Sequence, residues 1–132
     1  MNRKLAGLAT ALCLLGLASG ARAAPANDDA YAPYVHPQLR VPMAAGRSIH
    51  VICMGQGSPT VILSAGAAGW SADWRLVQPV IARQTKVCAW DRAGNGFSGA
   101  SAEPQDVAHT EADLERALKG AGLAGPFVMV AH

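Results

Sequence analysis

The apolar positions of this chain fall mainly into short continuous runs, separated by turn residues and by two stretches with helical spacing. Runs of four to eight apolar residues predict buried strands, and spacings of three and four predict helices. We expect strands over 39–44, 47–54, 60–63, 86–90 and 127–130, and helices over 74–83 and 107–121. This alternation predicts an α/β fold with a mainly parallel sheet and helices on its faces.

The two predicted helices differ in regularity. Residues 107–121 place Val107, Leu114 and Leu118 on one face, and Lys119 lies late, where a positive charge suits the helix dipole. Residues 74–83 contain Pro79. Proline is tolerated only in the first turn of a straight helix, so this helix is either short or kinked.

Residues 1–23 have the three parts of a secretory signal. A positive Asn2–Lys4 segment precedes an apolar run from Leu5 to Leu17, and Ala21-Arg22-Ala23 offers small residues for cleavage. We expect an exported protein, periplasmic or secreted. The apolar run is shorter than the about 20 residues that span a bilayer, so no stable membrane anchor is expected.

The remaining chain divides into a linker or arm over 24–38 and one domain over 39–132. Without residues 1–23 it has eight basic and nine acidic residues, a net charge of −1. We therefore expect no nucleic-acid partner. Hydrophobic residues make up 51% and charged residues 15%, which excludes a disordered polyelectrolyte.

A glycine-rich loop follows the predicted strand 86–90. Its Gly94-x-Gly96-x-x-Gly99 spacing matches the dinucleotide fingerprint. That motif requires a helix that opens at the glycines, whereas helical periodicity begins only near Val107. The sequence therefore predicts no nucleotide cofactor.

Two cysteines remain in the predicted domain, Cys53 and Cys88, each within an apolar strand-like run. Export permits a disulfide. Buried free thiols are the alternative, and the spacing alone leaves both open.

The block from Gly46 to His132 resembles the first half of an α/β-hydrolase domain. Four pieces carry the resemblance in the family's order: 57–66 for the third strand and oxyanion loop, Trp74 with 77–79 for the first helix, 87–98 for the fourth strand and its Asp-Arg-x-Gly-x-Gly-x-Ser loop, and 125–132 for the fifth strand. The resemblance implies a truncated α/β-hydrolase fold with its first five strands and two helices.

The resemblance also implies roles for particular residues. The Ala67 backbone N–H would be one donor of an oxyanion hole, and Gly66 would allow the tight loop. Ala65 stands where the family often has His, a departure that a backbone donor tolerates. The second loop would be structural, through Asp91, Arg92, Gly94 and Gly96. No catalytic metal or organic cofactor is implied.

The family's nucleophile would be the residue directly after His132, and its acid and base lie further on. His132 is therefore not expected to be the catalytic base. Trp70 and Trp74 would either line an acyl pocket or pack in the core. In the family's strand order the second and fourth strands are neighbours, so the resemblance favours a Cys53–Cys88 disulfide.

Two functions follow as expectations. The first is the N-terminal fragment of an exported serine-type hydrolase that acts on an ester, amide or similar small-molecule substrate and is inactive alone. An Asp nucleophile would instead indicate epoxide or haloalkane chemistry. The alternative is a non-catalytic product that binds a partner, or itself, through an open sheet edge at 127–130.

Overall fold

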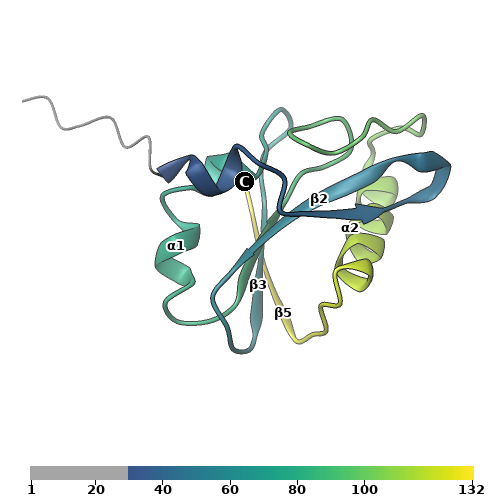
Figure 1. Cartoon of the computed structure of the whole chain (residues 1–132). Coiled ribbons are helices and arrows are strands. Elements are labelled where there is room, and N and C mark those ends of the chain that lie inside the picture. The colour runs from purple at the N-terminus through teal and green to yellow at the C-terminus, as the bar shows by residue number, and fades with distance from the viewer. Residues whose placement is uncertain (1–29) are drawn as a thin grey trace, which may run out of the picture.

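The computed structural model describes residues 30–132, so the predicted signal segment lies outside the described residues. A five-stranded sheet forms the centre, in the order β1-β2-β4-β3-β5 (Figure 1). Its strands are β1 (Leu39–Pro42), β2 (Ser48–Met54), β3 (Thr60–Ser64), β4 (Val87–Trp90) and β5 (Phe127–Ala131). The predicted α/β class is confirmed.

The sheet is mixed. β1 pairs antiparallel with β2, and β2 pairs antiparallel with β4. β3 pairs in parallel with both β4 and β5. The three parallel strands therefore end at the same edge, where the loops after β3 and β4 emerge.

The longer helix, α2 (Val107–Gly120), agrees with the predicted element. Asp106 caps its first turn, because the Asp106 carboxylate accepts a hydrogen bond of 2.9 Å from the His109 backbone N–H. A bidentate ion pair between Asp113 and Arg47 ties the middle of the helix to the chain just before β2. α2 thus covers one face of the sheet (Figure 1).

Of the two alternatives for residues 74–83, the short helix is the one that the structure shows. A 3₁₀ helix, η4 (Ser71–Trp74), comes first, and the α-helix α1 spans only Gln78–Ile81. Pro79 lies in the first turn of α1, where its missing N–H costs no helical hydrogen bond. α1 lies on the side of the sheet opposite α2 (Figure 1).

The two faces of the sheet carry separate apolar cores. The α2 side buries Val41, Ile49, Val51, Ile62, Cys88, Trp90, Ala93, Ala117 and Leu118. The α1 side buries Tyr34, Ile52, Leu63, Ala72, Val87 and Ala89. Successive strand residues alternate between the two lists, as the period of a strand requires.

Tyr34 belongs to the segment predicted as a linker or arm, yet its side chain is fully buried. Its hydroxyl donates to Gln78 Oε1 at 2.9 Å, and Gln78 Nε2 donates to the Ile52 and Val87 carbonyls at 2.9 and 3.2 Å. Burial raises the pKa of Tyr34 to about 12. Residues 30–38 therefore pack against the domain through this hydrogen-bonded chain.

Cys53 and Cys88 are opposite each other on β2 and β4, and a disulfide joins them. Their Cα atoms are 4.1 Å apart. The bond links two antiparallel strands and joins residues that are 35 positions apart in the sequence.

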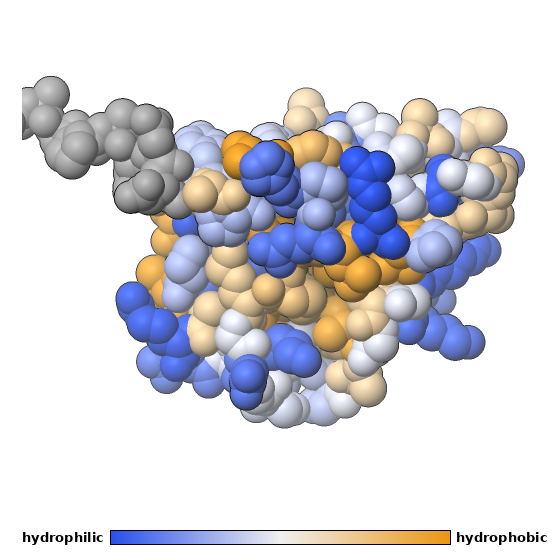
Figure 2. All heavy atoms as spheres, in the orientation of Figure 1, coloured by the Kyte–Doolittle hydropathy of each residue, from blue (hydrophilic) through white to orange (hydrophobic). Residues whose placement is uncertain are grey.

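The sheet ends at β5, an edge strand with exposed apolar side chains. Phe127, Val128 and Met129 are 37%, 44% and 50% exposed. The space-filling view shows apolar side chains exposed in the middle of one face, among hydrophilic ones (Figure 2). Within residues 30–132, no helix is long and apolar enough to cross a membrane.

Candidate active site

The carboxyl ends of β3, β4 and β5 meet at one edge of the sheet. The His132 N–H donates to the Ser64 carbonyl at 3.1 Å, which continues the parallel pairing past the end of β5. The loop 65–69 follows β3, and the loop 91–99 follows β4. In open α/β sheets, ligands bind outside this edge, so these loops define the candidate site.

The first loop is a tight turn that presents Ala67 to solvent. The Gly69 N–H donates to the Gly66 carbonyl at 2.9 Å, which closes a four-residue turn over 66–69. Ala67 is exposed, and its N–H donates to no other residue of the part that the structure describes. This N–H is therefore free to donate to a ligand.

Gly69 permits this turn to pack against η4. An added Cβ at Gly69 would overlap the Asp73 carboxylate and lie 2.9 Å from the Ala65 Cβ. Asp73 itself accepts a hydrogen bond of 3.2 Å from the Trp70 N–H. The absence of a side chain at Gly69 therefore sets the distance between the loop and η4.

The second loop is organised around Asp91, whose side chain is fully buried. Asp91 accepts hydrogen bonds from the Ser71 N–H at 2.7 Å, the Phe97 N–H at 2.9 Å and His50 Nδ1 at 2.8 Å. Burial alone raises the pKa of this carboxyl, but the hydrogen bonds from His50, Phe97 and Ser71 outweigh burial and lower the pKa below its usual value. Asp91 is thus a carboxylate held in place, facing away from the solvent.

His50 extends this network to the chain before β1. The Gln38 N–H donates to His50 Nε2 at 3.2 Å, so Nδ1 carries the proton that it donates to Asp91. Ser98 Oγ accepts from the His50 N–H at 2.9 Å and donates to the Asp91 carbonyl at 2.6 Å. Both ends of the second loop are therefore fixed to β2.

Arg92 connects the two loops. Its guanidinium donates to the carbonyl oxygen of Gly66, at the start of the turn that carries Ala67. Arg92 also lines, with Ala67 and four other residues, a cavity of about 330 Å³. The structure thus brings Gly66, Ala67 and Arg92 together.

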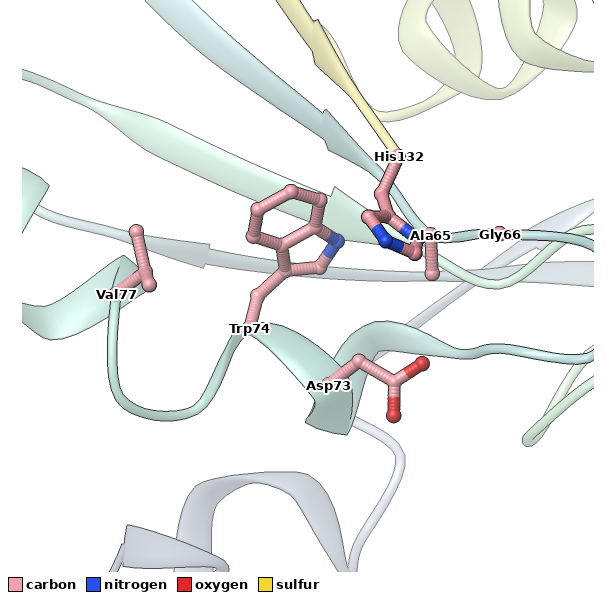
Figure 3. Close-up of a pocket in the computed structure, with 6 residues that line it drawn as sticks. All are labelled: Ala65, Gly66, Asp73, Trp74, Val77 and His132. Atoms are coloured by element: carbon pink, nitrogen blue, oxygen red, sulfur yellow. The ribbon is translucent and has the colours of Figure 1, made fainter.

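A second cavity, of about 310 Å³, also borders the first loop. It is lined by Ala65, Gly66, Asp73, Trp74, Val77 and His132 (Figure 3). The indole nitrogen of Trp74 points toward His132 in this view (Figure 3). Trp74 Nε1 is buried and has no hydrogen-bond partner among the described residues. Trp74 therefore lines a cavity while also packing against the α1-side core.

The other predicted loop residues have structural surroundings. Gly94 and Gly96 adopt positive φ angles of 80° and 50°. Trp70 packs edge-on against Phe97, with ring centroids 5.9 Å apart. No group of three or more His, Cys, Asp or Glu within residues 30–132 is arranged to hold a metal ion.

The sequence did not predict the interactions that organise this region. Asp91 forms hydrogen bonds with His50, Ser71 and Ser98. Arg92 donates to the carbonyl of Gly66, 26 positions earlier in the chain. One signal was present, since His50 interrupts an otherwise apolar strand. A polar side chain in a buried strand requires a partner.

Comparisons with known proteins agree with this architecture, although no protein-family model matches the chain. An AB hydrolase superfamily protein of Gibberella zeae is 33% identical over 75 residues, which are 56% of this chain and 23% of that protein. The chain spans about a quarter or less of the length of the curated relatives it matches.

Two solved structures show the same arrangement. An α/β hydrolase from Sphaerobacter thermophilus has 30% identity and a TM-score of 0.58, over 69% of this chain and 35% of that one. An α/β-hydrolase-fold protein from Burkholderia ambifaria has 24% identity and a TM-score of 0.64, over 74% and 35%, a likeness that shows the fold alone. The chain therefore has part of the α/β-hydrolase fold, and its homologues are proteins of that fold.

Proposed function

We propose that this chain forms the N-terminal part of an exported serine-type α/β hydrolase that acts on an ester, amide or similar small-molecule substrate. The observation that carries the proposal is the free N–H of Ala67, at the carboxyl edge of β3. The preceding residue, Gly66, lies next to the end of β5, since an added Cβ on Gly66 would be 3.2 Å from His132 Nδ1. The nucleophile would be the residue that follows His132.

In this proposal the chain contributes electrostatic stabilisation. Attack on the substrate carbonyl places negative charge on its oxygen, and a backbone N–H aimed at that oxygen stabilises the tetrahedral intermediate. The Ala67 N–H supplies one such donor, and the residue after the nucleophile supplies the second. The nucleophile, its acid and its base come from the rest of the protein, so residues 1–132 alone are inactive.

The cavity beside the first loop supports a small substrate. Its walls include the apolar side chains of Ala65, Trp74 and Val77, and its volume is about 310 Å³. A short acyl chain fits such a space, which lies at the small end of ligand pockets. No metal or organic cofactor is part of the proposed reaction.

Export is supported by the covalent link between β2 and β4. Disulfides persist in oxidising compartments and are rare in reducing ones. The bond agrees with the secretory signal predicted over residues 1–23, and we propose that the protein is periplasmic or secreted.

The test uses the longest reading frame that contains this chain. It should hydrolyse p-nitrophenyl acetate and react with a fluorophosphonate probe, with the adduct mapped by mass spectrometry to the residue directly after His132. The chain that ends at His132 should give neither signal. An adduct at another position would overturn the proposal, and hydrolysis of epoxides or haloalkanes without labelling would move it to an Asp nucleophile.

A proline substitution tests the contribution of the Ala67 N–H to catalysis. Ala67→Pro removes the N–H at the second position of a β-turn, where proline is well tolerated. We expect kcat to fall about 100-fold with KM nearly unchanged. Ala67→Gly keeps the N–H and is the control. Equal activity of Ala67→Pro and Ala67→Gly would show that this N–H is not an oxyanion donor.

A further inference from the structure

The hydrogen bond from Arg92 ends on the same peptide group that carries the candidate oxyanion donor. Arg92 donates to the Gly66 carbonyl oxygen, and the N–H across that peptide bond belongs to Ala67. A peptide group is planar, with its C=O and N–H antiparallel in the trans form. A group that fixes the direction of the Gly66 oxygen therefore fixes the direction of the Ala67 N–H.

The Gly66 oxygen has two acceptor sites, and both have donors. The Gly69 N–H donates to it from within the turn, and Arg92 donates from the neighbouring loop. The first bond sets the turn, whereas the second comes from an independent element that is anchored to β4. The peptide between Gly66 and Ala67 is thus held from two sides.

From this geometry we infer that Arg92 is a positioning residue for the oxyanion hole: it aims and polarises the Ala67 N–H. The inference rests on the proposed hydrolase function. A cationic donor on a carbonyl draws electron density through the peptide, so the N–H on the other side becomes a stronger donor. Arg92 acts through the peptide group and does not itself touch the substrate oxygen.

The charge of Arg92 is available for this role. Its neighbour Asp91 directs its carboxylate to His50, Ser71 and Phe97. Within residues 30–132, no Asp or Glu forms an ion pair with Arg92. An uncompensated cation at a half-buried position beside Ala67 also favours negative charge on a ligand oxygen bound there.

A spectroscopic test needs no catalysis. In the ¹³C,¹⁵N-labelled chain, Arg92→Met should move the Gly66 carbonyl ¹³C and the Ala67 ¹⁵N resonances upfield, because both respond to hydrogen bonding at that carbonyl. Arg92→Lys, which keeps a cationic donor, should restore part of both shifts. Arg83→Met is the matched control, since the Arg83 side chain is exposed and forms no hydrogen bond or ion pair with the described residues. Circular dichroism checks that each variant is folded.

A kinetic test uses the longest reading frame that contains this chain. We expect Arg92→Met to lower kcat about tenfold with KM within twofold, a smaller loss than complete removal of a donor causes. Arg92→Lys should recover part of kcat, and Arg83→Met should match the wild type. In the Ala67→Pro background, Arg92→Met should cost little more, since the donor that it aims is already gone.

The outcomes separate this inference from the function on which it rests. Unchanged Gly66 and Ala67 resonances in Arg92→Met would overturn it, as would shifted resonances with unchanged kcat. A tenfold loss that persists in the Ala67→Pro background would also overturn it. If the wild-type protein shows neither hydrolysis nor labelling, the proposed function fails, and the resonances still decide whether Arg92 holds this peptide.

Discussion

At the scale of single residues, Asp91 is the group on which the second loop depends. Three donors from three separate segments converge on its buried carboxylate, namely His50, Ser71 and Phe97. Hydrogen bonds to a charged group are stronger than neutral ones, and an unpaired buried donor is costly. The loop geometry around the candidate oxyanion site is therefore tied to the ionisation of one carboxyl.

The lowered pKa of Asp91 predicts how stability depends on pH. Between the folded pKa and the unfolded value near 3.9, the unfolded chain binds more protons, so the free energy of unfolding falls as the pH falls through this interval. Asp91→Asn should lose about 2 kcal/mol at pH 7. Its deficit relative to the wild type should shrink below about pH 4.

Urea denaturation at pH 7 and at pH 3 measures both differences. The exposed Glu111→Gln substitution is the control and should show almost no deficit at either pH. A deficit of Asp91→Asn that stays constant with pH would mean that ionisation of Asp91 does not stabilise the fold.

Gly96 is the second residue that the loop requires. At a φ of 50°, an added Cβ would overlap the Asp91 carboxylate and lie 2.9 Å from the Trp70 ring. We expect Gly96→Ala to destabilise the protein by about 3 kcal/mol, since the Asp91 network must shift in addition to the backbone strain. Thermal and urea denaturation measure the change.

Gly46→Ala is the matched control for Gly96→Ala. Gly46 has a φ of 72°, but an added Cβ there has nothing within 4 Å. It should cost only about 1 kcal/mol, the strain of a left-handed backbone. Equal losses at the two positions would show that the space beside Asp91 is not what requires glycine.

At the scale of elements, the disulfide joins β2, which carries His50, to β4, which leads into Asp91. It connects the antiparallel and parallel parts of the sheet. Both strands are otherwise held by backbone pairing and by the two cores. The bond therefore secures the strands that position the second loop.

Loss of the disulfide should be measurable in stability. For a separation of 35 residues, the chain-entropy model predicts a loss of about 4 kcal/mol in the Cys53→Ala/Cys88→Ala variant. Urea denaturation with and without reductant measures it. Reductant should destabilise the wild type and leave the double variant unchanged. In the chain without residues 1–23, whose only cysteines are Cys53 and Cys88, titration of two free thiols in the unreduced, unfolded protein would contradict the bond.

At the scale of the whole molecule, the exposed apolar edge is at β5. Phe127, Val128 and Met129 are each more than a third exposed, and an edge strand presents unpaired backbone groups. The alternative function, self-association or partner binding through the edge, would use this surface. In the hydrolase proposal, the same surface is covered by the rest of the protein.

Self-association is therefore expected for the chain that ends at His132. Met129→Lys should weaken it, because an edge lysine opposes strand addition. Val107→Lys is the control, since Val107 is 83% exposed and lies on α2. Sedimentation velocity at several concentrations measures the change. A wild-type chain that is monomeric at all concentrations would contradict this prediction.

Local pattern alone predicted much of the fold. Every predicted strand is present in the structure. A continuous apolar run bounded by turn residues is a local pattern, so a segment of about ten residues is enough to predict a strand. The helix over 107–121 was also predicted, whereas its cap was open between Asp106 and Thr110, and the structure shows Asp106. For residues 74–83 the pattern left open whether Pro79 begins a short helix or kinks a longer one, and the structure shows the short helix.

The sequence by itself determined the strands, the longer helix, their order and the positions of the two glycine-rich loops. Only the tertiary structure decided which groups meet there: His50 with Asp91, and Arg92 with the Gly66 carbonyl. Those partners are 41 and 26 residues apart. Periodicity reports only whether a position is buried, whereas the identity of a distant partner depends on strand order and loop packing, which act across the whole sheet.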